Sequence, residues 1–389
     1  MSGEVAYLDH AATTPLREGA ERAWLEAVHQ LRECPGNPAA LHDGGRKAKR
    51  LLEDAREKIA HCLGADRAEV IFTSGATESN ALAIVGSFRA MRAKTGRNIV
   101  QVCAADHPSS WNQRTLIERE GGRWVPVNLN SDGTAQVDDI DPAAAIISVT
   151  AVSSEIGVLQ PVGQIASARG DALLHVDVAQ ALHTQTIALH ADNLDLITVA
   201  GHKIGAPVGI GALAIKRGTP LETDRPGGDQ ESKYRSGTVD VAGACALAAA
   251  ITEVTDERER FSRHCMALRE RLLAGLPSGV KLTTDAPTAP TIVHLSIPTA
   301  HPEAVLLGLD RHHVLASAGS ACHAGVTRPS RVMLDMGRTE AEALGVLRLS
   351  FGPTSRAEDI DAFVSALPEA LRGAQALDAL DVRATGGKQ

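Results

Sequence analysis

The chain has 389 residues, a net charge of −8 and 44% hydrophobic residues. This length predicts two domains, and the acidic balance argues against nucleic acid as the main partner, because phosphate binding needs a basic face. The longest apolar stretch, residues 241–254, is too short to span a bilayer, and the N-terminus lacks the regions of a signal peptide. We therefore expect a cytoplasmic protein without a membrane anchor.

Short apolar runs alternate with amphipathic helical patterns over the first 216 residues. The helical patterns include 45–63 and 78–94, and the apolar runs predict seven buried strands at 70–73, 99–104, 124–129, 145–150, 173–178, 194–200 and 210–216. This alternation is typical of an α/β fold with a mainly parallel sheet.

The pattern changes after about residue 255. A charged helix is expected over 256–273, after an Ala-rich buried helix around 241–254. A Pro-rich loop and a final helix accompany three further strands, expected near 291–296, 313–317 and 346–351. This part predicts a smaller α+β domain.

The six cysteines show no CxxC spacing, so no structural zinc site or other metal site is expected. In a reducing cytosol they should be free thiols, and most are expected to be small core residues.

Three short segments carry side chains suited to one chemistry. Lys203 follows an apolar run between glycines, where its amine could attack an aldehyde cofactor, although most lysines are surface residues. Asp177 ends another apolar run and could pair with the pyridinium nitrogen of pyridoxal phosphate; a helix cap is the alternative. Residues 73–80 join a strand to a helix, and their small side chains let backbone N–H groups approach an anion; a capping box is equally compatible.

The order of these motifs resembles the class V aminotransferase family of fold-type I pyridoxal-phosphate enzymes. More narrowly, it resembles the cysteine desulfurases that serve iron–sulfur cluster assembly. The resemblance covers nearly the whole chain and rests on the segments 7–14, 36–38, 73–78, 155–157, 175–177, 201–203, 235–238, 319–322 and 348–352. The segment 319–322, Gly-Ser-Ala-Cys, is the most specific, because it separates desulfurases from other members.

The resemblance implies a large domain over residues 15–257 with a mainly parallel seven-stranded sheet. Residues 1–14 and 258–389 would form the small domain, which carries the catalytic-cysteine loop at about 317–330. It further implies the conversion of L-cysteine to L-alanine, with the sulfur held as a persulfide on Cys322.

The cofactor implied by the resemblance is pyridoxal 5′-phosphate. Lys203 would bind it covalently and later take the substrate's Cα proton. Asp177 would pair with the ring nitrogen, and Gln180 would hydrogen-bond the phenolic oxygen. His107 would stack on the ring and relay protons, and its place just after an apolar strand favours this role over that of an ordinary loop histidine.

The cofactor phosphate would be held by Gly75, Ala76, Thr77 and His202. Thr238 would complete the phosphate site of the neighbouring protomer, which implies a homodimer with shared active sites. The sulfur would then pass to an acceptor protein, either an iron–sulfur scaffold or another client.

Substrate binding is assigned to Arg348 and Ser154. Arg348 would hold the carboxylate with its planar fork, with a surface arginine as the alternative. Ser153 and Ser154 stand where the family usually has two asparagines, so substrate could bind more weakly. Ala200 replaces a phosphate-binding serine, which removes a hydrogen bond worth about 1 kcal/mol.

Further departures from the family pattern are Asp229 at a usual glycine, Ser232 at a usual arginine and His323 at a common threonine. Two alternatives stay open. One is a pyridoxal-phosphate lyase that cleaves selenocysteine, cystine or another cysteine derivative without using Cys322. The other is a catalytically silent sulfur-relay scaffold.

Overall fold

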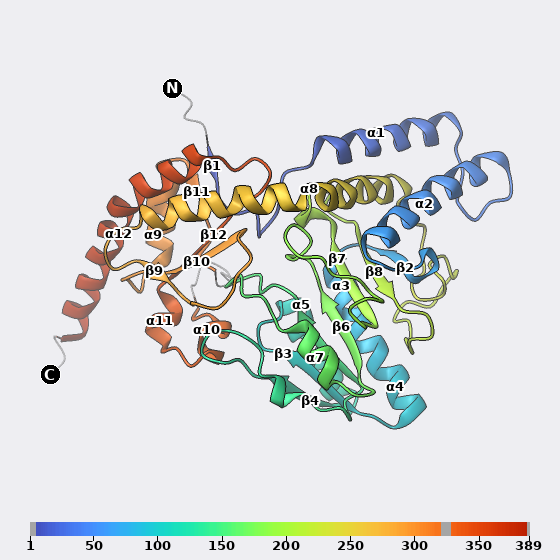
Figure 1. The fold of residues 1–389 in the computed structure, drawn as a ribbon, viewed down its shortest axis with the longest axis horizontal. Helices are drawn as coiled ribbons and strands as arrows, with labels where there is room; N and C mark the ends of the chain where they lie inside the picture. Colours follow the sequence, from blue (N-terminus) through green and yellow to red (C-terminus); the bar gives the residue numbers. More distant parts are fainter. Residues whose placement is uncertain (1–4, 320–327, 387–389) are drawn as a thin grey trace.

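A computed structural model describes residues 5–319 and 328–386 of the chain. Two bodies of unequal size lie side by side, and one long helix, α8 (Val241–Ala274), runs across both of them (Figure 1). The larger body contains a seven-stranded sheet and the smaller one a three-stranded sheet.

The large sheet has the strand order β2-β8-β7-β6-β5-β3-β4. Only β8 runs against its neighbours, which confirms the prediction of a mainly parallel seven-stranded sheet. Its strands are β2 (Val70–Thr73), β3 (Ile99–Cys103), β4 (Arg123–Val127), β5 (Ile146–Thr150), β6 (Leu173–Asp177), β7 (Leu196–Ala200) and β8 (Gly211–Ile215).

Helices cover both faces of this sheet, so most of its strands are apolar along their whole length. In β6, Leu174 and Val176 point into one core and Leu173 points into the other. The helices of this body are α1 (Glu18–Glu33), α2 (Asp43–Cys62), α3 (Ala76–Ala81), α4 (Ser87–Thr95), α5 (Pro108–Trp111), α6 (Arg114–Arg119) and α7 (Val162–Ala168). A π turn, Leu82–Gly86, joins α3 to α4 in one continuous run.

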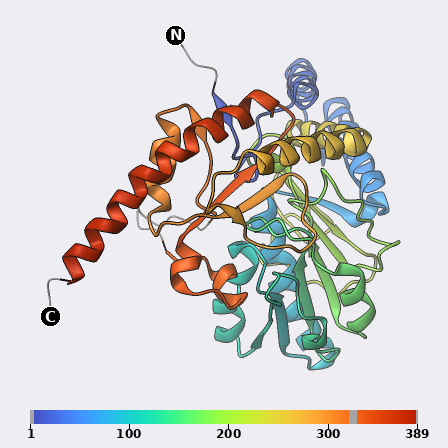
Figure 2. The ribbon, with the colours of Figure 1, turned by 60° about the vertical axis from the view of Figure 1, so that its left-hand side comes forward.

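The small body packs around a separate hydrophobic core. Its sheet has the order β12-β10-β9, and the N-terminal strand β1 pairs with β11 in a second small sheet. The strands are β1 (Ala6–Tyr7), β9 (Lys281–Leu282), β10 (Ile292–Ser296), β11 (Val314–Leu315) and β12 (Val346–Ser350), and the helices on this core are α9 (Pro302–Asp310) and α12 (Ala357–Gly386). The short helices α10 (Arg331–Asp335) and α11 (Glu340–Leu344) follow in the same part of the chain, but their buried residues Val332, Met333 and Ala343 pack in the large core. Figure 2 shows α12 crossing this body and extending beyond it.

The two helices expected over 241–254 and 256–273 are one helix of 34 residues. No glycine or proline interrupts the chain between the Ala-rich and the charged half, so nothing ends the helix there. Its first half packs in the large core, whereas Phe261, Cys265 and Leu268 pack in the small one. A boundary at residue 257 therefore falls inside a continuous helix.

Within the described residues, no helix combines the length and the apolar character needed to cross a membrane.

Candidate active site

A cavity of about 290 Å³ lies beyond the carboxyl ends of β5, β6 and β7. Parallel strands of an α/β sheet place their loops at this edge, where ligands usually bind. The cavity brings together most of the site residues that the sequence predicts. They are Gly75, Ala76, Thr77, His107, Ser154, Asp177, Gln180, His202 and Lys203.

Lys203 lies in a short 3₁₀ turn directly after β7. Its Nζ donates hydrogen bonds to the carbonyl oxygens of Ala11 (2.5 Å) and Ala12 (2.7 Å). Burial, together with the positive charge of Arg348, lowers the pKa of Lys203 to about 8. The amine is therefore much more easily deprotonated than an ordinary lysine, as a nucleophile toward an aldehyde requires.

Asp177 ends β6 and is almost fully buried. Its Oδ2 accepts a hydrogen bond from Asn80 Nδ2 at 2.8 Å, and its Oδ1 accepts one from the Ala179 N–H at 2.9 Å. Both bonds fix the carboxylate at the cavity wall. Sequence reasoning did not single out Asn80, although it lies in the predicted anion-binding segment.

His107 caps the N-terminus of α5, where its Nδ1 accepts a hydrogen bond from the Ser109 N–H at 3.1 Å. The neutral ring therefore carries its proton on Nε2. Asn80 Nδ2 also donates to Ser109 Oγ at 2.9 Å, so one amide links the histidine cap to Asp177. Burial lowers the pKa of His107, and the charges of Lys203 and Arg348 add to this effect, against the opposing charge of Asp177.

The turn at Gly75 leads from β2 into α3. Gly75 has a φ of 143°, which favours glycine, and a Cβ on Gly211 would come within 2.6 Å of its Cα. The absence of a side chain at Gly75 and Gly211 thus lets the two backbone segments pack closely against each other. The first N–H groups of the helix, at Ala76 and Thr77, have no intrahelical partner and can bind an anion.

Ser74 is not available for an anion, because Glu78 accepts hydrogen bonds from both its N–H (2.7 Å) and its hydroxyl (2.5 Å). Glu78 itself pairs with Arg225 at 2.9 Å and Arg235 at 3.1 Å. Burial would raise the pKa of Glu78, but the Ser74 bonds and the charge of Arg235 outweigh it and lower the pKa. These contacts of Glu78 were not predicted from the sequence.

Arg348 lies on β12 and contacts Ser154, which lines the cavity, but Arg348 itself does not line the cavity. Its Nη1 donates to the Ser154 carbonyl and its Nη2 to Asp9 Oδ1, both at 2.9 Å. Its Nε is buried and has no hydrogen-bond partner among the described residues. Asp9, which sequence reasoning also missed, belongs to the N-terminal segment that holds Lys203.

Three of the predicted residues need separate mention. Gln180 lines the cavity, and its Nε2 donates to the Ala11 carbonyl at 2.9 Å. Thr238 is exposed and does not line the cavity of its own chain. Cys322, like its neighbour His323, lies outside the described residues.

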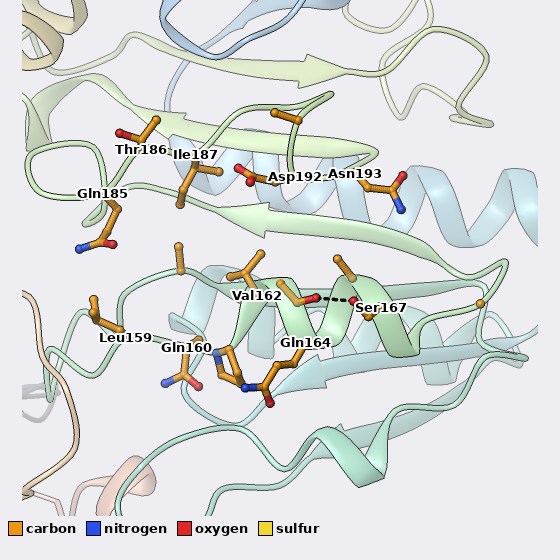
Figure 3. A pocket seen from close by; sticks show the side chains of 16 residues that line it. Leu159, Gln160, Val162, Gln164, Ser167, Gln185, Thr186, Ile187, Asp192 and Asn193 are labelled. Atoms are coloured by element: carbon orange, nitrogen blue, oxygen red, sulfur yellow. Dashed lines mark hydrogen bonds between the residues drawn. The ribbon is translucent and has the colours of Figure 1, made fainter.

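A larger surface groove of about 970 Å³ lies between α7 and residues 185–193 (Figure 3). None of the predicted site residues that the structure describes lines this groove. Its Gln160 side chain is already bonded to Ala135 and Gly133, and its Ser167 hydroxyl donates to Gly163. We therefore place the active site in the smaller cavity, where the reactive side chains meet.

The polar groups of that cavity fit pyridoxal phosphate. The helix start at Ala76 suits the phosphate, the Asp177 carboxylate can accept a hydrogen bond from a protonated ring nitrogen, and the Lys203 amine suits the aldehyde. His107 lines the same cavity.

The chain belongs to the aminotransferase class V family, whose sequence profile matches residues 6–363. The enzymes of this family depend on pyridoxal phosphate.

Among its relatives, an IscS-like cysteine desulfurase of Mycobacterium tuberculosis is 36% identical over 95% of this chain and 97% of its own length. The solved structure of a NifS-like protein from Rickettsia africae has a TM-score of 0.84 and 26% identity, and covers 94% of this chain and 99% of that one. The structure of SspA in complex with cysteine has a TM-score of 0.76 and 27% identity, and covers 90% and 99%.

Proposed function

We propose that this protein is a pyridoxal-phosphate-dependent cysteine desulfurase. It converts L-cysteine to L-alanine and keeps the sulfur as a persulfide on Cys322. The observation that carries this proposal is the meeting of Lys203, Asp177 and His107 in one cavity, with Arg348 bonded to Ser154 of the cavity wall. Relatives that match over nearly the whole chain are named cysteine desulfurases.

Bound pyridoxal phosphate supplies an electron sink that lets a substrate Cα proton leave. The residues of this chain prepare that step. Lys203, with its lowered pKa, supplies the amine and then accepts the proton. Asp177, oriented by Asn80, holds the proton of the ring nitrogen. His107 keeps its Nδ1 on Ser109, so its Nε2 is the atom left to move protons.

Arg348 is the carboxylate anchor for L-cysteine in this proposal. Asp9 and the Ser154 carbonyl hold two of its nitrogens, which fixes the plane of the guanidinium before substrate arrives. A guanidinium with its orientation fixed loses less entropy on binding a carboxylate. The cysteine ligand in the SspA structure supports the same substrate class.

Sulfur transfer is assigned to Cys322. Its thiolate attacks the substrate sulfur, so an S–S bond forms as the C–S bond of the substrate breaks. The three-carbon product takes up a proton and leaves as L-alanine, and the enzyme keeps a persulfide. Persulfide sulfur then passes to an acceptor protein, either an iron–sulfur scaffold or another client.

We also propose a homodimer with shared active sites. Thr238 is exposed and away from its own cavity, as a residue that serves a partner's phosphate should be. Val208 lines the cavity and is 83% exposed. An apolar side chain this exposed at an active-site cavity suits a protein interface.

The remaining assignments follow from the family. We place the enzyme in the cytoplasm, where its thiols stay reduced. We assign residues 15–257 to the cofactor domain, and 1–14 with 258–389 to the small domain; the presence of two separate cores supports a division into two domains.

A paired assay tests this function. Wild type and Cys322→Ser are incubated with L-cysteine and a reductant, and sulfide and alanine are measured. We expect equal amounts of both products from wild type and neither from the variant. Sulfide from Cys322→Ser would assign the enzyme to the C–S lyases, and no turnover with bound cofactor in wild type would favour the silent scaffold.

A further inference from the structure

Glu155 lies next to the cofactor cavity and contacts the residue that precedes α10, yet the proposed mechanism gives it no task. It follows Ser154, which lines the cavity, in the turn after β5. Its Oε1 accepts a hydrogen bond from Ser330 Oγ. Ser330 comes soon after Cys322 in the sequence and directly before α10. One hydrogen bond therefore links the cavity wall to the described chain that follows Cys322.

The turn that carries Glu155 is held on several sides. The Ser153 N–H donates to the Val158 carbonyl at 3.0 Å, and the Gly157 N–H donates to the Ser153 carbonyl at 2.9 Å. Gly157 has a φ of 73°, and a Cβ there would come within 3.0 Å of Ile292 on β10. The turn cannot shift freely, so the position of the carboxylate is well defined.

Ser330 is equally constrained on the other side. Its Oγ accepts a hydrogen bond from the Met333 N–H at 3.1 Å and so caps α10, while its own N–H donates to the Ala343 carbonyl at 3.1 Å. The single hydroxyl proton goes to Glu155. The same oxygen atom thus ends the helix and contacts the cavity turn.

Nearby charged side chains and an adjoining cavity also connect Glu155 with the proposed active site. Burial raises the pKa of Glu155 to about 7, although the hydrogen bond from Ser330 and the positive charges of Arg348 and Arg331 act to lower it. A cavity of about 170 Å³ adjoins this contact and shares His107 and Ser154 with the cofactor cavity.

Arg331 provides a second, independent link between α10 and the segment after β3. Its guanidinium lies 3.9 Å over the Trp111 ring, and it donates to the carbonyls of Ala104 (2.5 Å) and Asp106 (2.9 Å). Loss of the Glu155 contact alone should therefore leave α10 docked. What it would change is the exact placement of Ser330.

We propose that Glu155 is a positioning residue for sulfur transfer. Through Ser330 it sets where the chain that follows Cys322 is anchored relative to the bound substrate. This inference rests on the proposed function, because it requires Cys322 to be the sulfur acceptor.

The test compares Glu155→Ala with Glu155→Gln in the holoenzyme. Alanine removes the acceptor of the Ser330 bond, whereas the glutamine side chain keeps an oxygen in the same place. For Glu155→Ala we expect kcat for alanine formation to fall at least about tenfold, with KM for L-cysteine and cofactor absorbance within about twofold of wild type. Glu155→Gln should restore most of kcat. Asp335→Asn, which removes a neighbouring carboxylate that pairs with Arg331 at 3.1 Å, should have little effect.

Three results would overturn the inference. The first is an unchanged kcat in Glu155→Ala. The second is a rise in KM of this variant as large as its fall in kcat, and the third is a Glu155→Gln variant as slow as Glu155→Ala.

If Glu155→Ala does not fold, Ser330→Asn is used instead. It keeps a helix-capping side chain but moves the donor, and it should lower kcat without changing KM. Cys322→Ser is measured in parallel. Sulfide from that variant would contradict the proposed function itself, whereas an inactive Cys322→Ser with a fully active Glu155→Ala would contradict only the role of Glu155.

Discussion

At the scale of single residues, the proposed site depends on the amine of Lys203, which is buried and lies near the positive charge of Arg348. Burial and Arg348 depress the pKa of Lys203 to about 8, although Asp9 and Asp177 partly oppose them. The free amine is the form that attacks the cofactor aldehyde. If Lys203 binds the cofactor, as we propose, its surroundings decide how readily the cofactor-free enzyme takes up pyridoxal phosphate.

We expect the rate of pyridoxal-phosphate uptake by cofactor-free enzyme to rise with pH and level off just above pH 8. An ordinary lysine, with a pKa of 10.5, would still gain rate above pH 9. Stopped-flow absorbance across this pH range measures it. In Arg348→Met the plateau should move to higher pH, because one neighbouring positive charge is gone. A plateau at the same pH in both proteins would remove Arg348 from the electrostatics of Lys203.

The sequence predicts the residues that would touch the cofactor better than those that hold them. Lys203, Asp177 and His107 follow apolar runs, so their positions at strand ends are visible without a structure. Asn80, Asp9 and Glu78 were missed, because their partners lie far away in the chain. Asp9 contacts Arg348, and Glu78 contacts Arg225 and Arg235, so only the folded chain shows these pairs.

At the scale of elements, the turn between β2 and α3 is the proposed phosphate site, because it exposes the start of α3 at the cavity. Gly75 adopts a φ of 143° and a ψ of 178°, a conformation almost restricted to glycine. No heavy atom lies within 4 Å of an added Cβ there, so a substitution would meet backbone strain rather than a clash.

We expect Gly75→Ala to destabilise the turn by about 1–3 kcal/mol, the usual cost of such a backbone conformation. The affinity for pyridoxal phosphate should fall correspondingly, as measured by titration of cofactor-free enzyme. Gly163→Ala is the matched control, because Gly163 also has open space around its Cβ but lies in α7 with an ordinary φ. Equal affinities in the two variants would contradict the role of the turn.

The elements of the large sheet could be predicted closely, and those of the second part less so. Strands buried on both faces give unbroken apolar runs, which stand out in the sequence. The strand expected at 313–317 is only two residues long, Val314–Leu315, because it pairs with the equally short β1. The continuity of α8 was missed, because its composition changes where it passes from one core to the other.

At the scale of the whole molecule, several histidines are buried in neutral form. Burial lowers their pKa from 6.5 to about 4 for His10, His175 and His183, and to about 3 for His294. Between these values the unfolded chain binds more protons than the folded one, so the free energy of unfolding rises with pH. Asp106 and Glu155, with pKa values raised to about 7, act in the opposite direction.

Because four histidines outweigh two carboxyl groups, we expect the holoenzyme to become more stable from pH 5 to pH 7. Thermal unfolding at fixed protein concentration, with pyridoxal phosphate in excess, measures this change. The gain should be smaller in His294→Asn, which removes the histidine with the lowest pKa. A melting temperature that falls between pH 5 and pH 7 would show that the carboxyl groups dominate.

The central claim is that sulfur from L-cysteine is transferred to Cys322. The most direct measurement is mass spectrometry of the holoenzyme after one equivalent of L-cysteine, without reductant and with the thiols alkylated under conditions that preserve persulfides. We predict a gain of one sulfur atom on the peptide that contains Cys322, together with one equivalent of alanine. Free sulfide with no added sulfur on that peptide would contradict the account.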